Sequence, residues 1–89
     1  MVKKKVTVTS KAGLHLRPAR DLCQLAVKFE TTSITIGFRE KTFNAKSMLG
    51  ILSACVQQMD EIELICSGGE EEEALAALTA FLESAEDPK

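Results

Sequence analysis

The sequence predicts an α+β fold, an open-faced β-sandwich in which three helices cover one face of a four-stranded antiparallel sheet. Segments that alternate apolar and polar residues are typical of half-buried strands, and segments with apolar residues every three or four positions are typical of helices. They follow one another in the order strand, helix, strand, strand, helix, strand, helix. Because 89 residues cannot cover both faces of a sheet, all three helices are expected on one face, and residues 1–89 are expected to form a single domain.

The first strand and the first helix each have a local signal. Residues 3–9 alternate and place Val6 and Val8 on one face. A helix is expected over about residues 16–28, because Pro18 suits a first turn, where its missing N–H has no helical partner to lose. The apolar stripe of this helix consists of Ala19, Leu22, Leu25, Ala26 and Phe29.

The middle of the chain predicts a hairpin and a short helix. Residues 32–38 alternate again, and a polar turn at 39–42 leads into a short strand near 42–45. Ser47 directly precedes the apolar segment 48–52. Serine is a favourable N-cap because its hydroxyl accepts a hydrogen bond from the first turn, so a short helix is expected after Ser47.

The last strand is expected at 61–67 and ends at Gly68 and Gly69. A helix is expected over about residues 70–85, and its four leading glutamates favour the positive end of the helix dipole. The inward-facing residues are expected to be Ile62, Leu64 and Cys66 in the strand and Ala74, Leu75, Leu78, Phe81 and Leu82 in the helix.

Charge and composition exclude several classes of protein. The net charge of −2 and the absence of Trp and Tyr disfavour a nucleic-acid-binding surface. No apolar run is long enough to insert into a membrane, and no signal-peptide pattern opens the chain. Residues 1–67 hold ten basic and six acidic side chains, whereas 68–89 hold one basic and seven acidic ones. The basic part suits phosphate groups or an acidic partner.

The three cysteines form no C-x-x-C pair, and there is a single histidine. These scattered residues lack the ligand spacing that is typical of structural zinc sites, so no metal is expected. An odd number of scattered thiols indicates a reducing, cytoplasmic location, with Cys23, Cys55 and Cys66 all buried.

One segment gathers groups that suit phosphate chemistry. It runs Gly13-Leu14-His15-Leu16-Arg17-Pro18-Ala19 and places the histidine directly before a helix. The free N–H groups at the start of a helix favour an anion, and Arg17 adds a charge-assisted contact. Both features also favour the neutral imidazole of His15, which keeps a lone pair for attack on phosphorus. An isolated capping histidine beside an incidental arginine fits the same spacing.

This segment resembles the active-site signature of HPr, the histidine-containing phosphocarrier family of the bacterial phosphoenolpyruvate:sugar phosphotransferase system. Lys46-Ser47-Met48-Leu49-Gly50 is similar to the regulatory site of the same family. Length, element order and the acidic last helix also match, so the resemblance covers essentially the whole chain.

The resemblance implies a role for each residue of the signature. His15 would accept a phosphoryl group from phosphorylated Enzyme I and pass it to the A component of a sugar permease, while Arg17 would position that group. The chain would be a carrier rather than an enzyme, and it would need no cofactor.

The resemblance also implies that Ser47 is phosphorylated by an HPr kinase/phosphorylase. Phosphorylation there would hinder transfer from Enzyme I and promote binding to catabolite control protein A. A phosphate at a helix N-terminus adds negative charge where the dipole tolerates it, so the fold would survive. An ordinary N-cap is the simpler interpretation of Ser47.

Large apolar side chains on the short helix predict a docking surface. Met48, Leu49 and Leu52 cannot all face the core from six residues, so one or two should be exposed beside Arg17 and Arg20. The family uses such a patch for Enzyme I and for permease domains, and methionine suits several partners. A monomer is expected.

Two alternatives remain open: a phosphocarrier of the nitrogen-related branch, and a regulatory binding module without phosphotransfer. The chain also departs from the family pattern. It lacks the tight Asn-Gly-like turn that the family often has near residues 37–41, so the position of that hairpin turn is left open. The loop 57–60 lacks a glycine often found there, and Leu16 is bulkier than the usual small residue.

Overall fold

The computed structural model of the protein describes residues 1–9 and 16–84. The order of the elements confirms the prediction. The strands are β1 (Val2–Thr7), β2 (Thr32–Phe38), β3 (Lys41–Asn44) and β4 (Glu61–Gly68). The helices are α1 (Leu16–Val27), α2 (Met48–Ser53) and α3 (Glu71–Ser84).

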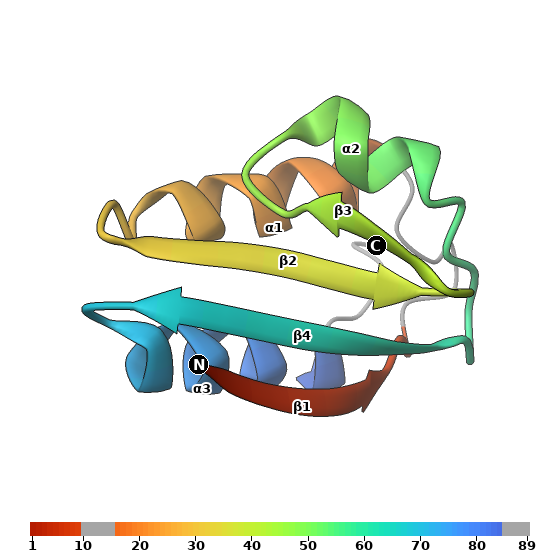
Figure 1. The fold of residues 1–89 in the computed structure, drawn as a ribbon. Coiled ribbons are helices and arrows are strands. Elements are labelled where there is room, and N and C mark those ends of the chain that lie inside the picture. Colours follow the sequence, from red (N-terminus) through yellow and green to blue (C-terminus); the bar gives the residue numbers. More distant parts are fainter. Residues whose placement is uncertain (10–15, 85–89) are drawn as a thin grey trace.

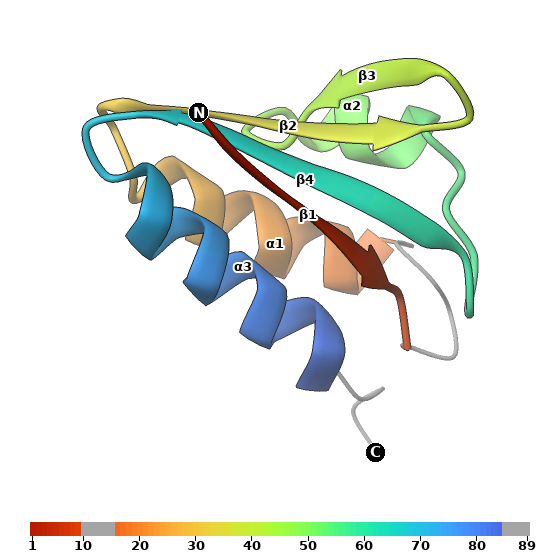
Figure 2. The ribbon, with the colours of Figure 1, turned by 60° about the horizontal axis from the view of Figure 1, so that its bottom comes forward.

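The four strands form one antiparallel sheet in the order β1-β4-β2-β3 (Figure 1). All three helices lie on one side of this sheet, as predicted, and the other face is open (Figure 2). The end of β1, the start of β4, the start of α1 and the end of α3 lie at one end of the molecule (Figures 1 and 2). No helix within the described residues is long and apolar enough to span a membrane.

The core lies between the sheet and the helices. Every second residue of β2 is buried, and so are Ile62, Leu64 and Cys66 of β4, as the alternation predicted. In α1 the stripe is buried at three positions, while Leu25 and Phe29 pack half-buried at its margin. The fully enclosed side chains include Val6, Val8, Leu22, Ile34, Ile36, Ile51, Ile62, Leu64, Leu78 and Leu82.

The start of α3 is fixed by contacts with the strands beside it. The Thr32 hydroxyl accepts a hydrogen bond from the Glu70 N–H at 3.0 Å. Glu71 accepts from the Gly68 N–H at 3.1 Å and pairs with the Met1 ammonium at 3.0 Å. The Gly68 N–H, and then the ammonium, lower the pKa of Glu71. The two contacts of Glu71 therefore stabilise the fold at pH values above the usual glutamate pKa. This stabilisation is lost as the pH falls through the lowered pKa of Glu71.

Gly68 is required by the backbone at this junction. Its φ is 142°, and a Cβ added there would lie 2.2 Å from the Thr31 carbonyl oxygen. Only glycine therefore allows β4 to end beside the Thr31 backbone.

The hairpin between β2 and β3 has a tighter turn than the sequence indicated. Phe38 pairs with Lys41, so Arg39 and Glu40 alone form the turn, and β3 begins one residue earlier than expected. Both turn residues have positive φ, 52° and 66°. This is the pattern of a type I′ turn, which normally selects Asn-Gly and matches the twist of the strands. The chain therefore forms the tight turn without the residues that favour it.

Replacing Glu40 by glycine should stabilise the protein. A non-glycine residue in the left-handed region costs about 1 kcal/mol or more, and the exposed Glu40 side chain offers little in return. We expect Glu40→Gly to raise the midpoint of urea unfolding, with Glu40→Ala, which keeps the strain, as the control. Equal midpoints for the two variants would contradict this explanation.

Candidate functional site

His15 lies outside the described residues, whereas the start of the helix that follows it in the sequence is described. α1 begins at Leu16, so the helix starts directly after the histidine, as predicted. Arg17 lies in the first turn and is exposed, and Leu16 is 61% exposed. Pro18, in the same turn, is half-buried.

The first turn of α1 suits an anion. It contains no acidic residue, so the N-terminal end of the helix keeps its positive partial charge. The first carboxylate of the helix, Asp21, is exposed and pairs with Arg20 at 3.6 Å. Arg17 is therefore the basic side chain placed directly at the helix start, where a phosphoryl group on the preceding histidine would make its contacts.

Ser47 is the N-cap of α2, as the sequence predicted. Its backbone is extended, with φ −111° and ψ 118°, and its Oγ accepts a hydrogen bond from the Gly50 N–H at 3.1 Å. Gly50 allows this close turn, because a Cβ there would lie 3.0 Å from the Asn44 carbonyl oxygen. Whether Ser47 is modified stays a prediction.

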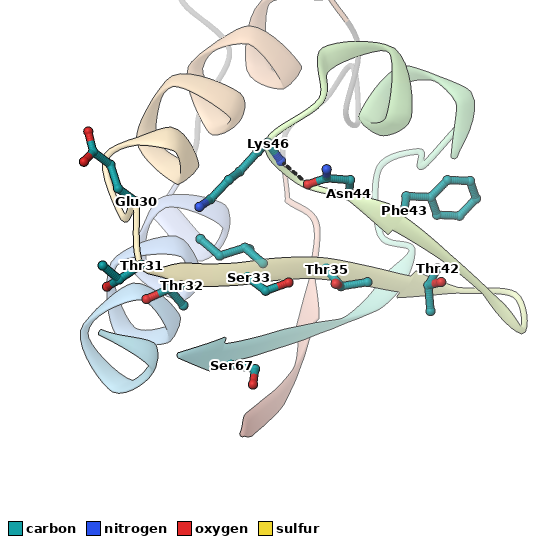
Figure 3. A pocket seen from close by; sticks show the side chains of 11 residues that line it. Glu30, Thr31, Thr32, Ser33, Thr35, Thr42, Phe43, Asn44, Lys46 and Ser67 are labelled. Atoms are coloured by element: carbon teal, nitrogen blue, oxygen red, sulfur yellow. Dashed lines mark hydrogen bonds between the residues drawn. The ribbon is translucent and has the colours of Figure 1, made fainter. Parts of the chain in front are cut away.

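Hydrogen bonds of Lys46 connect the turn before Ser47 to α1 and to the residues that directly follow α1. Its Nζ donates to the Phe29 carbonyl at 2.7 Å, and its carbonyl accepts from the Cys23 thiol at 3.3 Å. Its N–H donates to Asn44 Oδ1 at 2.9 Å (Figure 3). All three polar groups of this residue are thus engaged, which fixes Ser47 relative to α1. The sequence indicated Lys46 only as part of a motif, because its partners are distant in the chain.

Lys46 also lines a groove of about 600 Å³ beside the N-terminal half of β2 (Figure 3). Hydroxyl groups of Thr31, Ser33 and Thr35 are found along it. The groove lies near the C-terminal end of α1, since the lysine reaches Phe29 there. It is therefore separate from the start of α1 and from Arg17.

α2 exposes apolar surface, as the packing argument predicted. Ile51 is fully buried, Met48 and Leu52 are half-buried, and Leu49 is 80% exposed. The helix lies beside α1 (Figure 1). We use the name docking surface for the residues that were predicted to bind partners. Its exposed members are Arg17, Arg20 and Leu49, and its half-buried members are Met48 and Leu52. Its role in binding stays a prediction.

Two further exposed residues were not predicted. Cys55 comes after α2 at φ 56° and is exposed, so the expectation of three buried thiols is wrong for this residue. Met59 is 68% exposed in the loop before β4. The missing glycine in that loop was the one available signal for it.

The other two thiols are shielded. Cys66 is buried in β4, and this burial, with a smaller effect of Glu71, raises the pKa of its thiol. Cys23 is only half-buried, so the expectation of a buried thiol is not met at this position either. All three cysteines are free, and the described part of the chain brings together no set of His, Cys, Asp and Glu that could hold a metal.

Comparison with known proteins assigns the chain to a family. Residues 2–84 match the family model described as the PTS HPr component phosphorylation site. The chain belongs to the HPr family of the phosphotransferase system. It is 43% identical over 83 residues to the HPr-like protein Crh of Halalkalibacterium halodurans, covering 93% of this chain and 98% of that protein.

Solved structures agree with this assignment. An HPr from Thermoanaerobacter tengcongensis superposes with a TM-score of 0.91 at 39% identity, covering 94% of this chain and 93% of that one. The Crh of Bacillus subtilis, solved as a swapped, intertwined dimer, gives a TM-score of 0.76 at 38% identity, covering 99% of this chain and all of that one. The family is one of phosphoryl carriers rather than enzymes.

Removing the Ser47 hydroxyl should destabilise the fold modestly. Ser47→Ala leaves the Gly50 N–H without its acceptor, and the loss of such a cap costs about 1 kcal/mol. We expect a lower midpoint of urea unfolding with an unchanged slope, measured by circular dichroism. Ser47→Thr, which keeps a capping hydroxyl, serves as the control, and equal stability of the alanine variant would show that the cap contributes nothing.

Proposed function

We propose that this chain is the phosphoryl carrier of a sugar phosphotransferase relay. His15 accepts the phosphoryl group from phosphorylated Enzyme I and passes it to the A component of a sugar permease. The observation that supports this most directly is the histidine directly before α1, with Arg17 exposed in the first turn, in a member of the HPr family.

The chemistry requires only groups that this chain supplies. The neutral imidazole of His15 attacks phosphorus through Nδ1, the nitrogen that the family uses, and the bond to the histidine of Enzyme I breaks in the same step. The Arg17 guanidinium and the first N–H groups of α1 balance the charge on the transferred group. The reverse exchange delivers the group to the acceptor and returns His15 to its free form.

A regulatory module without phosphotransfer is the main alternative. It is favoured by two relatives named HPr-like protein Crh, one 43% identical and the other, from Bacillus subtilis, 40% identical. Such a module needs the fold and Ser47 but does not need a nucleophile. Because this chain has His15 together with Arg17, we favour the carrier. The Lys46–Gly50 motif also favours the sugar branch over the nitrogen-related branch.

We further propose that the protein acts in the cytoplasm as a monomer. The sheet is completed within one chain, since β1 pairs with β4 of the same molecule. The swapped dimer of the Bacillus subtilis Crh shows that a relative exchanges part of its chain instead.

The decisive experiment is incubation with Enzyme I and phosphoenolpyruvate. We expect one phosphoryl group per chain, labile in acid and stable in base, because phosphorus is bonded to nitrogen. His15→Ala should accept none while keeping a normal melting transition. Phosphorylation of His15→Ala would refute His15 as the acceptor. No phosphorylation of the wild-type protein would refute the carrier function and leave the regulatory module.

Ser47 is proposed as the regulatory site of the same protein, modified by an HPr kinase/phosphorylase and then recognised by catabolite control protein A. Its Oγ accepts the capping bond but keeps its own proton to release. A phosphate there would place negative charge next to the docking surface, where Enzyme I is proposed to bind. Transfer would fall because the partner must desolvate or approach that charge.

Ser47→Asp tests the regulatory role apart from the fold. Aspartate caps a helix as well as serine, so we expect stability within about 0.5 kcal/mol of wild type. Transfer from Enzyme I should nevertheless slow by roughly tenfold, a change of about 1.4 kcal/mol. Ser47→Asn, an equally good cap without the charge, is the matched control. Wild-type transfer by the aspartate variant would leave Ser47 as a cap only.

A further inference from the structure

Met59 is unusual in two respects: it has a positive φ although it is not a glycine, and its apolar side chain is exposed. The Asp60 N–H donates to the Gln57 carbonyl at 3.1 Å, which makes Met59 the third residue of a four-residue turn. Its φ is 72°, a value that type II turns require at this position and that favours glycine or asparagine. Its side chain is 68% exposed, so packing does not repay the backbone strain.

The backbone of the turn is held in place by two hydrogen bonds to Val8, which oppose relaxation of the strain. The Met59 N–H donates to the Val8 carbonyl at 2.7 Å, and the Val8 N–H donates to the Asp60 carbonyl at 2.9 Å. Asp60 Oδ2 also accepts from the Gln57 N–H at 2.9 Å. The backbone of Met59 is therefore held in position, with its side chain exposed to solvent. A strained residue that its surroundings hold in position is a reason to look for a function.

The position of Met59 relates it to the docking surface. Val8 lies just past the end of β1, so the turn lies where β1 ends and β4 starts. α1 begins at this end of the molecule (Figures 1 and 2). Met59 thus adds an exposed apolar side chain at the end of the molecule where α1 begins and Arg17 is exposed. The exposed Leu49 lies on α2, which packs beside α1.

We propose that Met59 is a contact residue for the protein that exchanges a phosphoryl group with His15, an inference that rests on the proposed function. The partner surface that fits is an apolar depression rimmed by carboxylates, because the docking surface pairs apolar side chains with Arg17 and Arg20. A carrier has to bind a donor and several acceptors with one surface. The unbranched, polarisable methionine side chain adapts to differently shaped partners better than a branched one.

Three variants separate the side chain from the backbone. Met59→Gly removes both the side chain and the strain, Met59→Asn tolerates the positive φ but is polar, and Met59→Leu stays apolar. We expect Met59→Gly to raise Tm by about 2–6 °C. Met59→Gly and Met59→Asn should each raise the KM of Enzyme I for the carrier by about fivefold, the loss expected for one apolar contact. Met59→Leu should raise it less than Met59→Asn.

Glu40→Gly is the matched control. It relieves the same kind of strain in the β2–β3 turn, which lies at the same end of the sheet as Met59 but on the other side of β4 from β1. It is expected to raise Tm without changing KM. A higher Tm combined with a higher KM in the Met59 variants alone supports the proposal. Wild-type KM in Met59→Gly and Met59→Asn would overturn it, as would a changed sedimentation coefficient with unchanged KM, which would assign Met59 to contacts between copies of this chain. Failure of the wild-type protein to accept phosphate would instead refute the carrier function itself, and the role of Met59 with it.

Discussion

The inner face of the sheet is the constraint on which the rest of the structure depends. It is the one large apolar surface of the described chain, and β4 runs through its centre with Ile62, Leu64 and Cys66 buried. The long helices α1 and α3 occupy most of this face. The short helix α2 is left at the side of β3, where it buries Ile51 and leaves Leu49 in solvent. The apolar surface of α2 is therefore exposed because α1 and α3 leave too little of the sheet face to cover the whole helix.

A helix of six residues does not form by itself in water, so α2 depends on its surroundings. Ser47 caps its start, Ile51 anchors its buried side, and Lys46 ties the preceding turn to α1 at Phe29 and Cys23. These contacts also set the position of Leu49 relative to α1. The docking surface therefore depends on Lys46, although the amino group of Lys46 is directed toward the far end of α1.

Local patterns predicted the elements well and the turns poorly. Alternation placed β2 at its observed bounds, and a serine before an apolar segment located α2, because both signals depend on residues close in sequence. The turn at Arg39 and Glu40 was displaced, because neither residue type favours the positive φ that strand pairing imposes. The contacts of Lys46 and the exposure of Cys55 could not be predicted, since they depend on how α1 and α2 pack.

The residues of the candidate site also differ in how far the sequence alone could identify them. A motif of neighbouring residues was sufficient to identify His15 and Arg17 as candidates, because the start of a helix brings its own N–H groups to an anion. The docking surface was also predicted from the sequence, but which of Met48, Leu49 and Leu52 is exposed depends on how α2 packs. Met59 needed both the sequence and the fold, because the missing glycine was visible in the sequence but its fixed and exposed position was not.

An open site suits a relay better than a pocket does. A carrier that held its phosphoryl group tightly would lower the free energy of the intermediate and slow the next transfer. Arg17 is exposed, and contacts at an exposed helix start contribute only about 0.3–2 kcal/mol. That range is enough to orient the group without trapping it. Under the proposed function, the specificity of transfer would come from docking, and apolar side chains left in solvent, such as Leu49, are the groups available for it.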